Sequence, residues 1–284
     1  MTRLAYVNGR YLPHGRAMVH IEDRGYQFAD GVYEVIPVER GRLVEEGPHL
    51  DRLDYSLGEL RIAWPVRRAV LSLILRELIG RNAVASGHLY LQVTRGVAPR
   101  DHRFPASVTS SLVITTKRQK PPPPSLFTDG ARVVTIPDIR WRRCDIKALS
   151  LLPNVLGKQQ AAEAGAFEAW QVDGDGMVTE GTSTNAWIVT ADGTLVTRQA
   201  SDAILNGITR LALARLLAAA GIAWRERPFS VAEAKAAREA FLTSSTSAVL
   251  PVTRIDDQPV GDGRPGPITR RLREHFLAAV VGAP

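Results

Sequence analysis

Apolar positions recur at two different periods along the first part of the chain. AYVNGRYLP at residues 5–13 and GVYEVIPVERGRLVEEG at residues 31–47 carry alternating apolar positions around the turn signals Asn8-Gly9 and Arg40-Gly41. Asn-Gly and similar pairs tolerate the positive φ angles of tight hairpin turns. Each of the two stretches therefore predicts a β-hairpin.

The period then changes from two residues to about 3.6. Residues 48–62 place Leu50, Leu53, Leu57 and Leu60 on one helical face, and residues 66–82 continue with a second amphipathic pattern. Strand-like alternation returns at residues 88–96 and 110–116. We therefore expect residues 1–116 to form a small α+β domain with an antiparallel sheet.

The sequence KRQKPPPPS at residues 117–125 is the clearest domain boundary, because four successive prolines favour an extended linker. Residues 126–284 should form a larger second domain. Its expected strands cover residues 131–137, 167–172, 176–181, 185–190, 239–245 and 248–256, and its expected helices cover residues 152–166, 206–221, 232–238 and 268–280. A hairpin turn is expected at residues 191–193.

The composition limits the class of protein to which the chain can belong. A chain of 284 residues, 45% of them hydrophobic, is long enough for two domains with sizeable cores. No window approaches the roughly 18 apolar residues of a membrane span, and the first residues lack the apolar core of a signal peptide. The single cysteine, Cys144, excludes an intramolecular disulfide framework and is expected to be a structural thiol. We therefore expect a cytoplasmic protein.

The charge pattern argues against nucleic acid as a partner. The net charge is +7, but the 36 basic residues are scattered among 29 acidic ones, without a basic run interleaved with aromatics. A solvated surface with some anion-attracting clefts is the better interpretation. The spacings of zinc sites, of a Walker loop, of a nucleophile elbow and of a dinucleotide fingerprint are all missing, so we expect no metal centre.

Lysine is rare in this chain, so each lysine can be considered individually as a candidate for a chemical role. Lys117 and Lys120 flank the prolines and Lys235 belongs to the polar face of a short helix. The stretch DIKALSLLPNVLGKQQA at residues 145–161 holds the other two, Lys147 and Lys158. Lys158 falls on the margin of the apolar face of a helix, where a solvated lysine is ordinary. Lys147 precedes that helix in an extended run, which favours it as the lysine presented to a cleft.

Two patches have the chemistry to bind an anion. Asn206 and Gly207 stand ahead of a strongly periodic helix with Thr209 in its first turn, where backbone N–H groups are free of intrahelical partners. The hydroxyl-rich LTSSTSA at residues 242–248 follows a strand signal. The alternatives are an ordinary N-cap and an ordinary turn. Two such patches in one domain favour a ligand that carries a phosphate.

Two loops carry further candidate side chains. EGTSTN at residues 180–185 places Glu180 between two strand signals, where either an exposed turn or a ligand contact is consistent with the pattern. RGVAPRDHRFP at residues 95–105 gathers four basic side chains, which are Arg95, Arg100, His102 and Arg103. Such a loop either binds a carboxylate or is simply a basic surface.

Several motifs together resemble the class IV aminotransferases, in order from about residue 3 to about residue 275. They are RGYQFADGVYEV, HLDRL, YLQVTRGVAPRDHRFP, DIRWRRCDIKALSLLPNVLGKQQA, VTEGTSTNAW, LNGITR and FLTSSTSAVLPV. Within the class, the D-amino-acid aminotransferases are most similar. The resemblance implies the two-domain fold type IV of pyridoxal-phosphate enzymes, α+β overall, with a small N-terminal α/β domain and a larger, β-barrel-like C-terminal domain with helices.

The resemblance also implies a role for each matching residue. In the family, the lysine of the DIK segment, here Lys147, forms the Schiff base with the aldehyde of pyridoxal 5'-phosphate. Glu180 matches the carboxylate that faces the pyridine nitrogen, and Leu205 matches a side chain that packs on the ring. The residues that match the phosphate-binding positions are Arg52, Ile208, Thr209, Ser244 and Ser245. Ala148 and Ser245 stand where the family often has serine and threonine.

The implied activity is a transamination from a D-amino acid such as D-alanine to a 2-oxo acid such as 2-oxoglutarate or pyruvate. Tyr33, Arg100 and His102 resemble the set that holds the substrate carboxylate. Family members are homodimers with the active site between the domains, and the loop carrying the arginine and histidine can come from the neighbouring subunit. The alternatives are a branched-chain L-aminotransferase, an (R)-amine transaminase, an aminodeoxychorismate-type lyase and a non-enzymatic anion- or nucleic-acid-binding protein.

Overall fold

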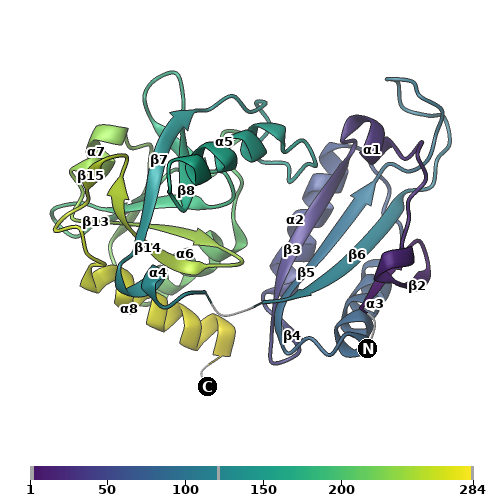
Figure 1. The fold of residues 1–284 in the computed structure, drawn as a ribbon, viewed down its shortest axis with the longest axis horizontal. Helices are drawn as coiled ribbons and strands as arrows, with labels where there is room; N and C mark the ends of the chain where they lie inside the picture. The colour runs from purple at the N-terminus through teal and green to yellow at the C-terminus, as the bar shows by residue number, and fades with distance from the viewer. Residues whose placement is uncertain (1–2, 120–121, 283–284) are drawn as a thin grey trace. The chain divides into compact units, whose positions relative to one another are not determined.

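The computed structural model describes residues 3–119 and 122–282 and divides into two compact units (Figure 1). The first unit comprises Met1–Lys120 together with Ile146–Ser150. The second comprises Pro121–Asp145 together with Leu151–Pro284. The chain therefore leaves the second unit at residue 146 and rejoins it at residue 151. The predicted boundaries placed residues 146–150 in the second domain and did not include this excursion into the first unit.

A six-stranded sheet forms the centre of the first unit. Its strands are β1 (Leu4–Val7), β2 (Arg10–Pro13), β3 (Gly31–Glu39), β4 (Arg42–Leu43), β5 (Ser86–Thr94) and β6 (Ser111–Arg118). They follow the order β2-β1-β6-β5-β3-β4 and every pair is antiparallel. Asn8, Gly9, Arg40 and Gly41 all have positive φ angles, which confirms both predicted hairpin turns. The antiparallel sheet predicted for this domain is therefore confirmed.

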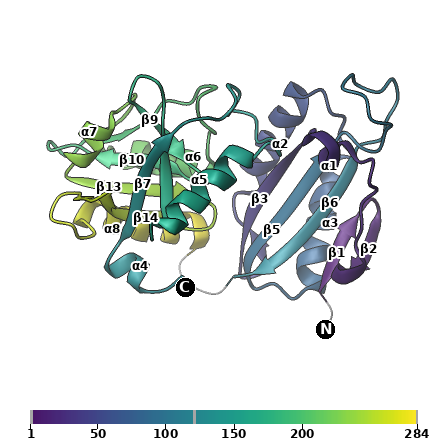
Figure 2. The ribbon, with the colours of Figure 1, turned by 45° about the horizontal axis from the view of Figure 1, so that its top comes forward.

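Two long helices cover one face of this sheet, as both views show (Figures 1 and 2). The helical segments of the unit are η1 (His14–Arg16), α1 (Arg24–Phe28), α2 (Glu46–Glu59) and α3 (Arg68–Arg81). The leucine stripes predicted from sequence pack with the even-numbered residues of β3 in one core. The odd-numbered residues of β3 project to the other face, and those from Tyr33 to Glu39 are half-buried.

The second unit is built on a nine-stranded mixed sheet. Its strands are β7 (Ala131–Pro137), β8 (Glu168–Val172), β9 (Val178–Gly181), β10 (Asn185–Val189), β11 (Leu195–Thr197), β12 (Trp224–Glu226), β13 (Glu239–Ser244), β14 (Ala248–Ile255) and β15 (Gln258–Pro259). The order is β12-β11-β10-β13-β14-β7-β8-β9, with β15 paired to β14. The sheet curls until β9, at one end, lies against β10. This confirms the barrel-like domain that the resemblance implied.

Helices of the second unit cover both faces of the curled sheet. They are α4 (Ser125–Thr128), α5 (Leu152–Glu163), α6 (Ile208–Ala219), α7 (Val231–Lys235) and α8 (Pro267–Phe276), followed by η2 (Leu277–Gly282). Ala240 and Leu242 of β13 enter one core, whereas Phe241 enters a second core with residues of α6 and α8. Because this sheet is buried on both faces, most positions of its strands are apolar.

The structure corrects the predicted linker and adds short elements. Lys117 and Arg118 end β6, where they pair with His88 and Gly87, so the linker does not begin at residue 117. Lys120 lies outside the described residues. Two short strands, β12 and β15, were not predicted, because three and two residues respectively are too short for a periodic pattern. Within residues 3–119 and 122–282, no helix has the length and apolarity needed to cross a bilayer.

A buried carboxylate ties the first helix layer to the sheet. Glu34 of β3 is fully buried and accepts two hydrogen bonds from Arg52, at 2.8 Å each, and one from His49 Nδ1 at 2.7 Å. Burial alone would raise the pKa of Glu34, but the charge and hydrogen bonds of Arg52, with help from His49, hold that pKa at about 2. Burial lowers the pKa of His49, so its ring is a neutral donor at pH 7.

We expect Glu34→Gln to lower the stability of the first unit in a pH-dependent way. The folded-state pKa of about 2 lies below the ordinary value of 4.5, so the ionised pair stabilises the fold above pH 4.5 and ceases to do so as pH falls toward 2. At pH 7 the variant leaves the Arg52 charge buried without its partner, which costs about 3–5 kcal/mol. Urea unfolding at pH 7, 5 and 3 measures this difference, which should shrink toward pH 3.

Glu39→Gln is the matched control for that experiment. Glu39 lies on the same strand, is only half-buried, and bonds the Ser86 hydroxyl at 2.8 Å. Its removal should change the unfolding free energy by less than about 1 kcal/mol at every pH. A Glu34→Gln penalty that stays constant from pH 7 to pH 3 would contradict the linkage argument.

Candidate active site

Lys147 is held at the edge of the first unit's sheet. Residues 147–149 pair with the start of β3: Tyr33 N–H donates to the Lys147 carbonyl and Leu149 N–H donates to the Gly31 carbonyl, both at 3.0 Å. Ile146 and Ala148 are buried in the core of the first unit, so Lys147 projects to the opposite face. Lys147 therefore shares a face with Tyr33. The extended run predicted around Lys147 is present only in part, because Ala148 alone bridges β3 and its N–H donates to the Ile146 carbonyl at 2.7 Å, which closes a tight turn at Lys147.

Aromatic side chains surround the Lys147 amine. Its Nζ lies 4.2 Å from the centroid of the Tyr33 ring, within the range of a cation–π contact. Tyr33 in turn packs against Tyr90 of β5, with ring centroids 5.7 Å apart. Burial raises the pKa of Tyr90 to about 12, and its hydroxyl donates to Gln92 at 2.7 Å. Tyr90 is therefore neutral near pH 7 and gives Lys147 no anionic partner.

Arg52, matched to a phosphate-binding position, lies on α2 and forms the bidentate pair with Glu34 already described. This pair fixes the orientation of the guanidinium group. The Lys147 backbone N–H donates to Ser56 on the same helix, at 3.2 Å. Helix α2 therefore positions both Arg52 and the backbone of Lys147.

The loop after β5 presents Arg100 and His102 at the surface. The Arg100 guanidinium lies 4.5 Å from the Phe28 ring centroid, and the His102 ring lies 5.3 Å from it. The structure thus brings these two predicted carboxylate ligands together. Among the described residues, no interaction joins either of them to Tyr33 or Lys147.

Of the other two basic residues predicted on this loop, Arg95 was wrongly grouped with them, whereas Arg103 is exposed as expected. Arg95 is buried, and its guanidinium bonds Asp30 at 2.7 and 2.9 Å and two backbone carbonyls of the turn after α2. Arg103 pairs with Asp101 at 2.7 Å. Arg95 has a structural role instead, because it anchors the base of the loop.

Glu180, in the second unit, is a buried carboxylate with several donors. It ends β9 beside Gly181, and its side chain is 7% exposed, so an exposed turn is excluded. Leu205 N–H donates to its two oxygens at 3.1 and 3.2 Å, and Asn185 Nδ2 donates to Oε2 at 3.0 Å. Arg140 also donates to Oε1. Arg140, Asn185 and Leu205 therefore hold both oxygens of this buried carboxylate in a fixed orientation.

Asn185 links Glu180 to the start of α6. Its amide nitrogen also donates to the Leu205 carbonyl at 2.9 Å, and its Oδ1 would lie 2.1 Å from a Cβ placed on Gly207. Only glycine therefore fits at this N-cap. Leu211 N–H bonds the Gly207 carbonyl, so the N–H groups of residues 208–210, which include the candidates Ile208 and Thr209, have no i−4 partner within the helix. The helix start has donors and a dipole suited to an anion.

Ser244 and Ser245 lie where β13 turns into β14. Ser244 pairs with Ala248, and its Oγ accepts a hydrogen bond from Ser247 N–H at 3.1 Å, so the predicted turn is present. Thr243 pairs with Asn185 across β10 and β13, which places this turn at the same end of the sheet as Asn185. No interaction in the described part of the second unit joins Ser244 or Ser245 directly to residues 208 and 209.

Sequence patterns missed Arg140 and Asn185. The Arg140 side chain is 6% exposed; besides Glu180 it bonds Asp138 at 2.7 and 2.9 Å and the Ala203 carbonyl at 3.1 Å. Burial would lower its pKa, but the bond to Asp138 and the charge of Glu180 raise it, so the guanidinium stays charged. Arg140 lies in the DIRWRRCDIK stretch and Asn185 in TSTN, but no local period marks either residue.

Two remaining side chains behave as expected from sequence. Lys158 of α5 is half-exposed, and its ammonium donates to the Phe167 carbonyl and lies 3.4 Å from Glu168. Burial raises the pKa of Cys144 to about 12, so this free thiol is protonated at neutral pH and is a poor nucleophile.

Comparison with known protein families shows which family the chain belongs to. The model of the family described as amino-transferase class IV matches residues 31–255. A D-alanine aminotransferase from Bacillus licheniformis is 44% identical over 274 residues, which cover 96% of this chain and 96% of that protein. The chain belongs to the class IV aminotransferases.

Solved structures of the class have the same fold. A branched-chain amino acid aminotransferase from Escherichia coli superposes with a TM-score of 0.91 at 23% identity, over 100% of this chain and 97% of that one. A 4-amino-4-deoxychorismate lyase from Pseudomonas aeruginosa superposes with a TM-score of 0.84 at 26% identity, over 98% and 99% of the two chains. The fold is thus shared by enzymes with different reactions.

We expect Arg140→Gln to destabilise the second unit. The variant removes the Arg140 guanidinium from the buried carboxylates of Asp138 and Glu180, which costs about 3–5 kcal/mol at pH 7. In the native fold Arg140 offsets the effect of burial and lowers the pKa of Asp138, so without it this pKa should rise. Thermal unfolding at pH 7 and pH 4 measures the loss, which should be smaller at pH 4 because protonation removes the unpaired charge.

Arg142→Gln removes the same charge from an exposed neighbouring position. It should change the unfolding free energy by less than about 0.5 kcal/mol. Equal effects of the two variants would mean that the Arg140 pairs do not stabilise the fold.

Proposed function

We propose that this chain is a pyridoxal-phosphate-dependent D-amino-acid transaminase, which moves the amino group of a D-amino acid such as D-alanine to a 2-oxo acid. The observation that carries the proposal is the 44% identity to a D-alanine aminotransferase over nearly the whole of both chains. The Arg100 and His102 pair supports the same substrate class, because charge-assisted donors suit an α-carboxylate.

The residues of the candidate site fit pyridoxal phosphate. Lys147 offers a primary amine held at the strand edge of the first unit. Glu180 offers a buried carboxylate, oriented by Arg140 and Asn185, to a protonated ring nitrogen. The start of α6 offers free backbone N–H groups to a phosphate. When bound, the cofactor supplies an aldehyde that condenses with amines and a protonated ring that withdraws electrons.

Each side chain then has a stated task. Lys147 Nζ would anchor the cofactor and would take the proton from the α-carbon of the amino donor. In the second half-reaction it would give a proton to the α-carbon of the new amino acid. Glu180, oriented by Arg140 and Asn185, would accept the hydrogen bond of the ring N–H. Leu205 packs on the ring. Ile208, Thr209, Ser244, Ser245 and Arg52 hold the phosphate, while Tyr33, Arg100 and His102 hold the substrate carboxylate.

We also propose that the chain is active as a homodimer in which Arg100 and His102 serve the partner's site. Exposed apolar side chains support this: Met18, Ile21 and Tyr26 are 79%, 77% and 78% exposed. The segment that carries them joins the Arg100 loop through the Asp23–Val97 bridge. Several large apolar side chains exposed on one segment are a feature of protein interfaces. The cytoplasm is the proposed compartment, on the evidence of the single cysteine.

The first test is an assay with defined stereochemistry. Wild type should transfer the amino group of D-alanine to 2-oxoglutarate, and L-leucine should be a much poorer donor. Activity with L-leucine alone would favour a branched-chain enzyme, and pyruvate release without an amino acceptor would favour a lyase. Lys147→Ala should lower the rate by at least about 10²–10⁴-fold, because the proton-transfer group is removed.

Lys158→Ala is the matched control for this assay. It removes a lysine of the same sequence segment whose ammonium is bonded to a backbone carbonyl. It should keep most of the activity and the visible absorbance of the bound cofactor, whereas Lys147→Ala should lose both. Retention of both by Lys147→Ala would refute the assignment.

A mixing experiment tests the role of the partner subunit. Lys147→Ala and Arg100→Ala should each be nearly inactive. If Arg100 acts in the partner's site, each mixed dimer holds one intact site, and random mixing should restore about a quarter of the wild-type activity. If Arg100 acts within its own subunit, mixing should restore none. Sedimentation velocity on the same samples reports whether dimers form.

A further inference from the structure

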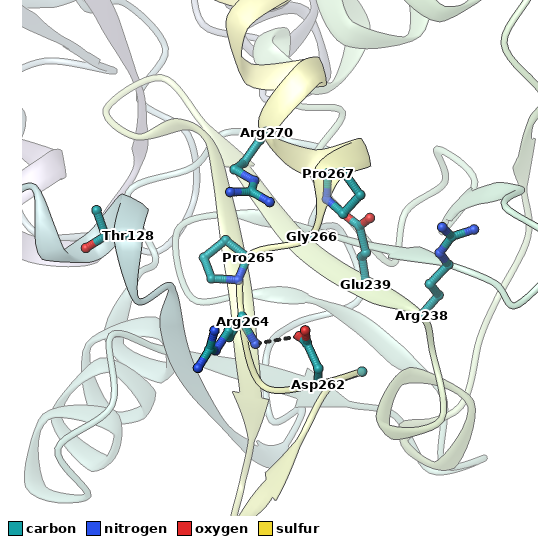
Figure 3. Close-up of a pocket in the computed structure, with 10 residues that line it drawn as sticks. Thr128, Arg238, Glu239, Asp262, Arg264, Pro265, Gly266, Pro267 and Arg270 are labelled. Carbon is teal, nitrogen blue, oxygen red and sulfur yellow. Dashed lines mark hydrogen bonds between the residues drawn. The ribbon is translucent and has the colours of Figure 1, made fainter.

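A pocket lies in the second unit, at the start of α8 (Figure 3). It has a volume of about 620 Å³, within the usual range of small-molecule sites. Its walls come from α4, the start of β13, the loop between β15 and α8, and the first turns of α8. All of these elements belong to one unit.

Three arginines line this pocket: Arg238, Arg264 and Arg270. In the view of Figure 3, Arg264 and Arg270 lie on either side of Pro265, and Arg238 lies beyond Glu239. None of the three guanidinium groups has a hydrogen bond or ion pair with a described residue, in contrast to Arg140 and Arg210 of the same unit. The pocket therefore contains three guanidinium groups that are not paired with described residues of the fold.

The two carboxylates of the pocket do not neutralise these arginines. Glu239 is buried, and its oxygens accept hydrogen bonds from Ile268 N–H at 3.0 Å and from Thr269 N–H at 2.8 Å. It caps α8 and so offsets the positive end of that helix. Asp262 accepts from the Arg264 backbone N–H at 3.0 Å and shapes the loop (Figure 3).

The walls of the pocket are conformationally restricted. Gly261 has a φ of +58°, and a Cβ there would lie 2.5 Å from the Arg238 carbonyl. A Cβ on Gly266 would lie 2.0 Å from Glu239, so the loop closes on β13 only with glycine at both positions. Pro265 and Pro267 fix two further φ angles. A restricted loop holds the backbone beneath Arg264 and Arg270 in place.

This pocket is distinct from the candidate active site of the same unit. Glu239 begins β13 and Ser244 ends it. Five residue steps of an extended strand separate their Cα atoms by about 17 Å. The arginine pocket lies at the Glu239 end, whereas the turn with Ser244 and Ser245 lies at the other end.

We propose that this pocket binds a small anion that carries two or more phosphate or carboxylate groups. A guanidinium group presents a planar fork of N–H donors that matches both kinds of oxyanion. Several charged groups on the ligand are required because the three arginines lie on different walls, and a single oxyanion pairs with one or two of them. The proposal does not depend on the transaminase activity.

The test is isothermal titration calorimetry on the full chain with inorganic pyrophosphate and, separately, with citrate. Wild type should show a saturable site, and the tighter of the two probes indicates whether phosphate or carboxylate is preferred. Arg264→Gln and Arg270→Gln should each weaken that site by about ten-fold or more, the loss expected for a charge-assisted hydrogen bond.

Arg271→Gln is the matched control. Arg271 lies on the same helix, is exposed and does not line the pocket, so its loss changes the net charge equally. It should change affinity by less than about two-fold. If pyrophosphate binds at the start of α6 instead, its binding should persist in the Arg264→Gln/Arg270→Gln double variant. A titration of that variant therefore detects binding at α6.

Equal weakening by Arg271→Gln, no effect of Arg264→Gln and Arg270→Gln, or no saturable binding to wild type would overturn the proposal. The double variant should keep the wild-type rate with D-alanine, because these arginines are outside the proposed catalytic machinery. Binding is measured without substrates, so a failed transaminase assay and a failed titration can be told apart.

Discussion

The pairing of residues 147–149 with the start of β3 is the constraint on which the candidate site depends. Two backbone hydrogen bonds and the buried side chains of Ile146 and Ala148 add this short segment to the edge of the first unit's sheet. A Cβ on Gly31 would lie 2.6 Å from the Val93 carbonyl and 2.8 Å from Leu149, so the pairing also needs glycine there. The alternation of the strand then projects Lys147 onto the face of Tyr33.

The same physical solution appears in both units. Glu34 and Glu180 are both carboxylates on strands, both buried, and both paired with an arginine held by further contacts. A buried carboxylate stays ionised only if cations and donors replace the water it has lost. Glu34 uses this to fix the orientation of Arg52, whereas Glu180 is itself the candidate ligand group and is oriented by Arg140 and Asn185. The same pairing thus serves a structural carboxylate in one unit and a candidate functional carboxylate in the other.

Much of the fold was predictable because it is local. Hairpins at Asn8-Gly9 and Arg40-Gly41, and the helices from residues 46–59 and 68–81, follow from turn chemistry and period, and the structure confirms them. The excursion of residues 146–150 was not predictable, because its pairing with β3 joins positions more than 100 residues apart. Arg95 was assigned to the wrong group for the same reason. Its partner Asp30 lies 65 residues away in the sequence, so the cluster of basic residues around Arg95 did not reveal the buried pair.

The choice between arginine and lysine explains how the charge of this chain is distributed. Only five of its 36 lysine and arginine residues are lysines, and within residues 3–119 and 122–282 the buried structural cations, such as Arg95 and Arg140, are arginines. A guanidinium group stays protonated when buried and serves several acceptors at once, whereas an ammonium group loses its proton more readily. A structural cation is therefore best made of arginine, and a group that must gain and lose a proton is best made of lysine. A chain with few lysines also offers few other primary amines to an aldehyde cofactor. The scarcity of lysine and the position of Lys147 on a fixed strand edge therefore support the same chemical role.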